Sequence, residues 1–175
     1  MPARVEPGTL RSLGPINAAI AAVAARVIGA RDMHLFSTLG RSRGLFRAWL
    51  YYSSRLMPFG KLSRRDSEMV ILRVAHLRRN AYEYGHHSRI SKRAGIDDAQ
   101  RLRIEEGPEA GWGDRERAIL RAVDEMVADR DVSDVAWSAL ARHLDPAELV
   151  SFVLLVTQYD GLATTIDTLR IQPDR

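Results

Sequence analysis

The 175-residue sequence contains no cysteine. This absence excludes disulfide bonds within the chain, metal sites built from thiolates, and every catalytic or redox mechanism that needs a thiol of its own. Aromatic residues make up only 7%, and glycine and proline are not enriched, which excludes a collagen-like or low-complexity chain. With 46% hydrophobic and 27% charged residues, the composition is that of a globular protein long enough to bury a core.

Long apolar runs and targeting signals are also missing. No uninterrupted apolar stretch approaches the roughly 20 residues of a membrane-spanning helix, and residues 1–8 lack the charged-then-apolar pattern of a secretory signal. We therefore expect a cytoplasmic protein that does not enter a membrane. The net charge is +4, but the basic residues form short, scattered groups without aromatic side chains placed to stack on bases. Nucleic-acid binding is accordingly not expected.

Helical periodicity dominates the sequence, and no stretch alternates as a strand would. The pattern predicts helices over residues 15–28, 35–56, 63–94, 97–102, 114–128, 133–143 and 146–169. A break near residues 78–80 would divide the longest segment into two consecutive helices, and Gly95 is a typical stop. Ser63, Asp97, Asp114 and Ser133 are the predicted N-caps. We expect an all-α fold in a single domain over residues 1–175.

Residues 80–87 read Asn-Ala-Tyr-Glu-Tyr-Gly-His-His and form the densest group of polar and titratable side chains. Glu83 and His87 are four residues apart, so on a helix they lie on one face and within reach of each other. A carboxylate and an imidazole in contact can move a proton near neutral pH. Tyr82 and His86 form a second pair with the same spacing on a neighbouring face. The spacing alone is equally consistent with an ordinary pair on a helix surface.

The residues around this segment extend the pattern. An acidic helix start precedes Leu72-Arg73-Val74-Ala75, followed by Tyr82-Glu83-Tyr84-x-x-His87 and an Ala94-Gly95 stop. Over about residues 62–97 this resembles the core motif of the carboxymuconolactone decarboxylase family, in the alkylhydroperoxidase D-like superfamily. The resemblance implies an alkylhydroperoxidase-like helical fold that assembles as a homo-oligomer, either a trimer or a hexamer. It does not identify a substrate.

The peroxidase branch of this superfamily has two cysteines where the resemblance places Asn80 and Glu83, with a histidine at His87 and an acidic residue at Glu68. That branch needs both thiols for peroxide reduction and disulfide exchange, and neither is present here. The resemblance therefore implies acid/base chemistry, with Glu83 as general acid/base and His87 as its proton partner. Glu68 would be the carboxylate that orients His87.

We expect a decarboxylase-like lyase or isomerase that acts without a cofactor on a small lactone or carboxylic acid. Asn80, Tyr82 and His86 are expected to line the substrate pocket. No metal site is expected, because adjacent histidines on a helix point about 100° apart and a His-Glu-x-x-His arrangement is absent. Two alternatives stay open: a peroxidase or antioxidant protein that works without thiols, and a non-catalytic oligomeric binding module.

Overall fold

The computed structural model of the protein describes residues 2–28 and 31–174, and all regular structure in these ranges is helical. The all-α prediction is therefore confirmed. The chain divides into two compact units, one of Met1–Ser53 with Thr164–Arg175 and one of Ser54–Ala163. The single domain over residues 1–175 stays a prediction.

The first unit holds α1 (Leu10–Ile28), α2 (His34–Leu39), the 3₁₀-helix η1 (Gly40–Ser42) and most of α3 (Gly44–Leu56). The helix predicted from residue 15 begins earlier, because α1 continues through a kink at Gly14. The φ of Gly14 is 75°, a left-handed conformation that costs a glycine little because it has no Cβ. The helix predicted over residues 35–56 is interrupted by η1, which separates α2 from α3.

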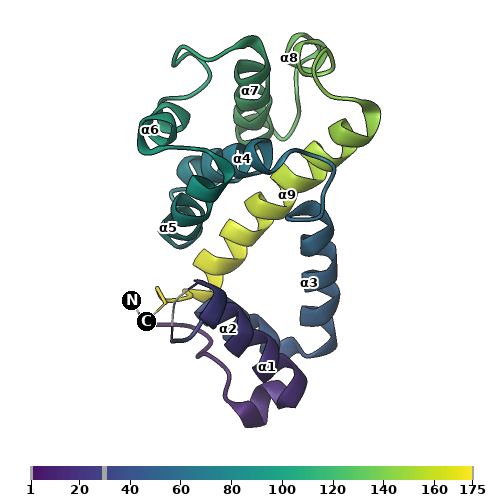
Figure 1. Ribbon diagram of the computed structural model, residues 1–175. Helices are drawn as coiled ribbons and strands as arrows, with labels where there is room; N and C mark the ends of the chain where they lie inside the picture. The colour runs from purple at the N-terminus through teal and green to yellow at the C-terminus, as the bar shows by residue number, and fades with distance from the viewer. Residues whose placement is uncertain (1, 29–30, 175) are drawn as a thin grey trace. The chain divides into compact units, whose positions relative to one another are not determined.

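The second unit is built around α4 (Arg64–Leu77), whose residues 66–75 are all buried. It packs against α5 (Ala81–Ile90), α6 (Asp98–Glu106) and α7 (Asp114–Asp129), as Figure 1 shows. Because α4 is buried around its whole circumference, its polar side chains must find partners inside the protein. Glu68 and Arg73 are two such side chains.

The junctions around α4 and α5 follow the sequence pattern closely. α4 ends at Leu77 and α5 begins at Ala81, which confirms the predicted break, and Gly95 ends the 3₁₀-helix η2 (Ser91–Ala94) with a φ of 82°. α6 runs to Glu106 rather than stopping at residue 102.

The predicted caps are mostly correct. The side chains of Ser63, Asp97 and Ser133 accept hydrogen bonds from the first turns of α4, α6 and α8 (Asp134–Leu140). Asp114 is an exception, because the N-cap of α7 is Gly113 and Asp114 is the first residue of the helix. An acidic side chain at that position still interacts favourably with the helix dipole.

The last helix, α9 (Pro146–Leu169), is long and apolar enough to cross a membrane by length and composition alone. The sequence has no uninterrupted apolar run of this length, because Gln158 and Asp160 lie within the helix. Phe152 and Leu155 are buried in the apolar core of the second unit. The core helix of a soluble protein meets the same criteria of length and composition.

Candidate acid/base site

Glu68 of α4 and His87 of α5 form a buried pair. Nδ1 of His87 lies 2.7 Å from Oε2 of Glu68, and the exposed fractions of the two side chains are 9% and 0%. Because Arg64 pairs with the same carboxylate, we assign the proton of this hydrogen bond to Nδ1, which donates it to Oε2 of Glu68. Nε2 makes no hydrogen bond with the described part of the chain, so it is the ring atom able to exchange a proton with a ligand.

The other oxygen of Glu68 meets a cation. Nη2 of Arg64, one turn earlier on α4, lies 3.2 Å from Oε1 of Glu68. The Arg64 side chain is 39% exposed, so it links a fully buried carboxylate to the solvent-accessible edge of the unit. This ion pair offsets the cost of burying the Glu68 charge.

Glu83 lies one turn before His87 on α5 and is only 3% exposed. The spacing in the sequence therefore places both side chains on the buried part of one helix, as predicted. The contact that the structure gives for the imidazole of His87 is nevertheless with Glu68. A role for Glu83 in catalysis stays a prediction.

Asn80 is the N-cap of α5. Its Oδ1 accepts a hydrogen bond of 2.9 Å from the backbone N–H of Glu83, and its Nδ2 donates to the carbonyl oxygen of Ala163 at 3.3 Å. The side chain is 1% exposed. Asn80 therefore fixes the start of the helix that carries Glu83 and His87, whereas its place in a substrate pocket stays a prediction.

Tyr82 and His86 form a contact of their own on the neighbouring face of α5. Their ring centroids are 4.7 Å apart with the planes tilted by 36°. His86 is buried and Tyr82 is half-buried. This geometry is consistent with the predicted second pair, and a contact with substrate stays a prediction for both residues.

Tyr159 of α9 also reaches this site. Its ring meets the imidazole of His87 edge-on, with centroids 5.3 Å apart and an interplanar angle of 87°. Burial raises the pKa of the Tyr159 phenol well above its ordinary value, and the negative charges of Glu68 and Glu83 raise it further. The phenol is therefore a neutral O–H group close to both carboxylates. No spacing in the sequence connects Tyr159 with α5.

The arrangement suits proton transfer more than metal or thiol chemistry. Within residues 2–28 and 31–174, no group of three or more histidine and acidic side chains could hold a metal ion. A buried imidazole oriented by one carboxylate, with a second carboxylate and a phenol nearby, can donate and accept protons away from bulk water. The expectation that no cofactor is needed stays a prediction.

Several solved structures share the fold of this chain. An uncharacterized peroxidase-related protein with an alkylhydroperoxidase AhpD core, from Ralstonia eutropha, has a TM-score of 0.83 at 19% identity, over 99% of this chain and 93% of that one. A peroxidase-related protein from Silicibacter has a TM-score of 0.80 at 13% identity, over 92% and 86%. The debrominase Bmp8 in complex with 2,3,4-tribromopyrrole has a TM-score of 0.80 at 16% identity, over 98% and 92%. At these identities the likeness establishes the fold.

Comparison of the sequence, rather than the fold, matches only part of the chain. No curated protein matches it at a significant level. The sequence pattern of the carboxymuconolactone decarboxylase family matches residues 43–125, which include Glu68, Glu83 and His87. Residues 43–125 of this chain are therefore similar to the carboxymuconolactone decarboxylase family, and the chain has an alkylhydroperoxidase D-like fold.

Proposed function

We propose that the protein is a cofactor-independent acid/base lyase or isomerase, of the decarboxylase type, acting on a small lactone or carboxylic acid. The observation that supports this most directly is the buried Glu68–His87 pair, in which Nδ1 and Oε2 are 2.7 Å apart. This contact orients the imidazole and leaves Nε2 to act on a substrate. Glu83 is proposed as a second acid/base group one turn away.

The proposed roles follow from the chemistry of a decarboxylation. The bond between a substrate carbon and its carboxylate breaks, carbon dioxide leaves, and the electron pair passes into the lactone as an enolate. A neutral phenol such as Tyr159 can donate a hydrogen bond to an enolate oxygen. Arg64 is a cation at the edge of the site that can bind the substrate carboxylate. Nε2 of His87, after taking up a proton from solvent, transfers that proton to the carbon and completes the product, so one proton is consumed for each carbon dioxide released.

Turnover of γ-carboxymuconolactone and related lactones tests this proposal. His87→Gln and Glu83→Gln should each lower kcat by about 100-fold or more, the usual contribution of a general acid or base. His143→Gln is a matched control outside the site. Equal activity of Glu83→Gln and the wild type would remove Glu83 from the mechanism. No turnover of any lactone by the wild type would instead favour a non-catalytic binding module.

A thiol-dependent peroxidase is disfavoured because the chain contains no cysteine. Two structural relatives are described as peroxidase-related, at 19% and 13% identity. Because the chain has no thiol of its own, peroxide consumption in the presence of a dithiol reductant should nevertheless stay at the background rate. Robust turnover in that assay would replace the acid/base proposal with a thiol-independent peroxidase.

We also propose that the protein is a cytoplasmic homo-oligomer, a trimer or a hexamer. Several apolar side chains are open to solvent within each unit, including Leu45 and Tyr51, each 72% exposed, and Val150, which is 61% exposed. Exposed apolar side chains of this kind are often covered by subunit contacts. Light scattering coupled to gel filtration measures the mass directly, and a monomer would contradict the proposal.

A further inference from the structure

A shallow cavity of about 270 Å³, open to solvent, lies where α4 passes into α5, within the second unit. Its volume is slightly below the roughly 300–1,000 Å³ of pockets for drug-sized ligands, so it suits a small molecule. Glu68, Glu83 and His87 do not line it, although Asn80, the N-cap of α5, does; the lining residues are Ala75, His76, Arg79, Asn80, Ala81, Tyr84 and Glu105.

Two nitrogen-bearing side chains line this cavity, the half-buried imidazole of His76 and the exposed guanidinium of Arg79. Neither the imidazole of His76 nor the guanidinium of Arg79 makes a hydrogen bond or ion pair with the part of the chain that the structure describes. The preceding Arg78, by contrast, forms an ion pair with Asp160 and donates to the carbonyl oxygen of Val127. Arg79 also has a φ of 53°, a left-handed conformation that residues with a side chain rarely adopt.

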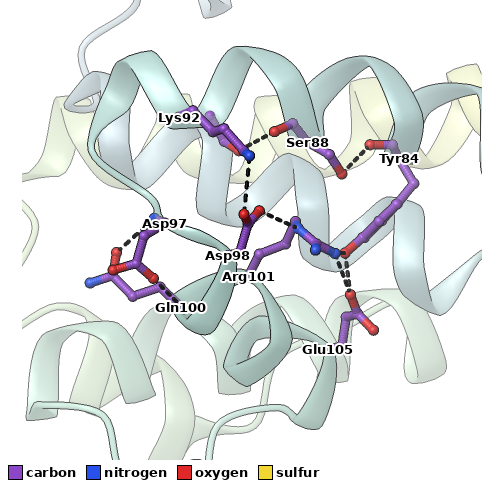
Figure 2. Close-up of polar contacts among 9 residues, drawn as sticks. Tyr84, Ser88, Lys92, Asp97, Asp98, Gln100, Arg101 and Glu105 are labelled. Carbon is purple, nitrogen blue, oxygen red and sulfur yellow. Dashed lines mark hydrogen bonds and ion pairs between the residues drawn. The ribbon is translucent and has the colours of Figure 1, made fainter.

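The opposite wall is held by a polar network, which Figure 2 shows. The hydroxyl of Tyr84 donates to Glu105, and Nη1 of Arg101 lies 2.6 Å from the Tyr84 oxygen and 3.0 Å from Oε1 of Glu105. Arg101 therefore offsets the charge of Glu105. Because that carboxylate is already neutralised, the cationic side chain of Arg79 dominates the electrostatics of the cavity.

We propose that this cavity is a second ligand site, which binds a small organic carboxylate. The carboxylate group would be held by Arg79 and His76, because guanidinium and imidazole N–H groups form strong, directional hydrogen bonds with carboxylates. The apolar body of the ligand would lie against the methyl groups of Ala75 and Ala81. The site is independent of the proposed reaction, although Ala81 belongs to the first turn of the helix that carries Glu83 and His87.

Isothermal titration of the full chain with benzoate tests the proposal, with benzyl alcohol as the uncharged analogue. Benzoate should bind once per chain. Arg79→Gln should weaken this binding by about tenfold or more, the usual loss for a hydrogen bond to a charged group. Ala81→Leu fills the apolar side of the cavity without changing charge, and should weaken binding similarly. Arg89→Gln removes the same charge from an exposed position on α5 outside the cavity, and should leave the affinity unchanged.

Three results would overturn the proposal. The first is the absence of benzoate binding to the wild type. The second is an equal loss of affinity in Arg79→Gln and Arg89→Gln, which would show only general attraction to a basic protein. The third is equal binding of benzyl alcohol, which would show that the cavity does not recognise the carboxylate. Thermal unfolding of each variant, followed by circular dichroism, confirms that the binding measurements compare folded proteins.

Discussion

Glu68 and His87 lie 2.7 Å apart between Oε2 and Nδ1, and the carboxylate has no exposed surface. One contact therefore does two things: it joins the buried helix α4 to α5, and it sets the orientation of the imidazole. A hydrogen bond to a charged group contributes about 1.5–3 kcal/mol to stability. The contribution of this contact to the free energy of unfolding can therefore be measured without an activity assay.

A double-mutant cycle on Glu68 and His87 should give a large coupling energy. Glu68→Leu and His87→Leu each leave a buried polar partner behind, whereas the double variant removes both, so the losses should not add. We expect a coupling of about 1.5–3 kcal/mol from urea unfolding. The exposed pair Lys92–Asp98 is the control, and its coupling should be much smaller than that of the buried pair. Equal values for the two pairs would contradict the buried contact.

Tyr159 should give the folded protein a specific pH dependence at alkaline pH. Its pKa is raised in the folded chain, chiefly by burial and then by Glu68 and Glu83, relative to about 10 in the unfolded chain. The unfolded state therefore releases this proton first. The contribution to stability is complete below about pH 10 and is lost as the pH rises above it, by up to about 1.4 kcal/mol per pH unit.

The measurement is the free energy of unfolding in urea, compared at about pH 9 and about pH 11. Tyr159→Phe should lose less stability than the wild type over this interval, because phenylalanine has no proton to release. Tyr52→Phe, at a 38% exposed position, should behave like the wild type. If all three proteins lose the same stability, the phenol of Tyr159 does not have a raised pKa.

The sequence predicted those parts of the site that depend on local geometry. Glu83 and His87 are placed by helical spacing, and Glu68 was added through the family resemblance, although 19 residues separate it from His87. Tyr159 could not be predicted in this way. It comes from α9, and its approach to His87 depends on how α9 packs in the second unit, for which the sequence carries no periodic signal.

Among the helix ends, too, the sequence predicted those that depend on neighbouring residues and missed one that does not. The caps at Ser63, Asp97 and Ser133 are hydrogen bonds over three residues, so the sequence was sufficient to predict them. The start of α1 was predicted at Pro15, because proline favours the first turn of a helix. The chain instead passes through a kink at Gly14 and continues back to Leu10, which no rule for a regular helix predicts.

Removing the ion-pair partner of Arg73 should strongly lower the free energy of unfolding. Arg73 is 7% exposed, forms a two-point ion pair with Asp124 at 2.6 and 2.9 Å, and donates to the carbonyl oxygens of Ile104 and Glu105. Asp124→Ala leaves the guanidinium buried without a counter-charge and should cost about 3–5 kcal/mol in urea unfolding.

Glu109→Gln provides the control for this measurement, because it breaks the exposed ion pair with Arg121. This substitution should cost about 0–1 kcal/mol. A loss in Asp124→Ala as small as that in Glu109→Gln would show that water reaches Arg73 and that the pair linking α4 to α7 is not buried in solution.

Asn80 can be assigned as a cap or as a substrate contact by comparing two substitutions. Asn80→Ala removes the acceptor for the N–H of Glu83 and should cost about 1–2 kcal/mol. Asn80→Asp keeps that acceptor but loses the donor to Ala163, so it should retain more of the stability than Asn80→Ala. If Asn80 acts only as a cap, lactone turnover should follow the same order.

Ser133→Ala is the matched control, because it removes the N-cap of α8, away from the acid/base site. It should cost about 1 kcal/mol while leaving lactone turnover unchanged. The informative exception would be an Asn80→Asp variant that is as stable as the wild type but as inactive as Asn80→Ala. An aspartate caps the helix equally well, so that result would assign Asn80 a role beyond capping, either a contact with the substrate or the electrostatic neutrality that Glu83 needs nearby.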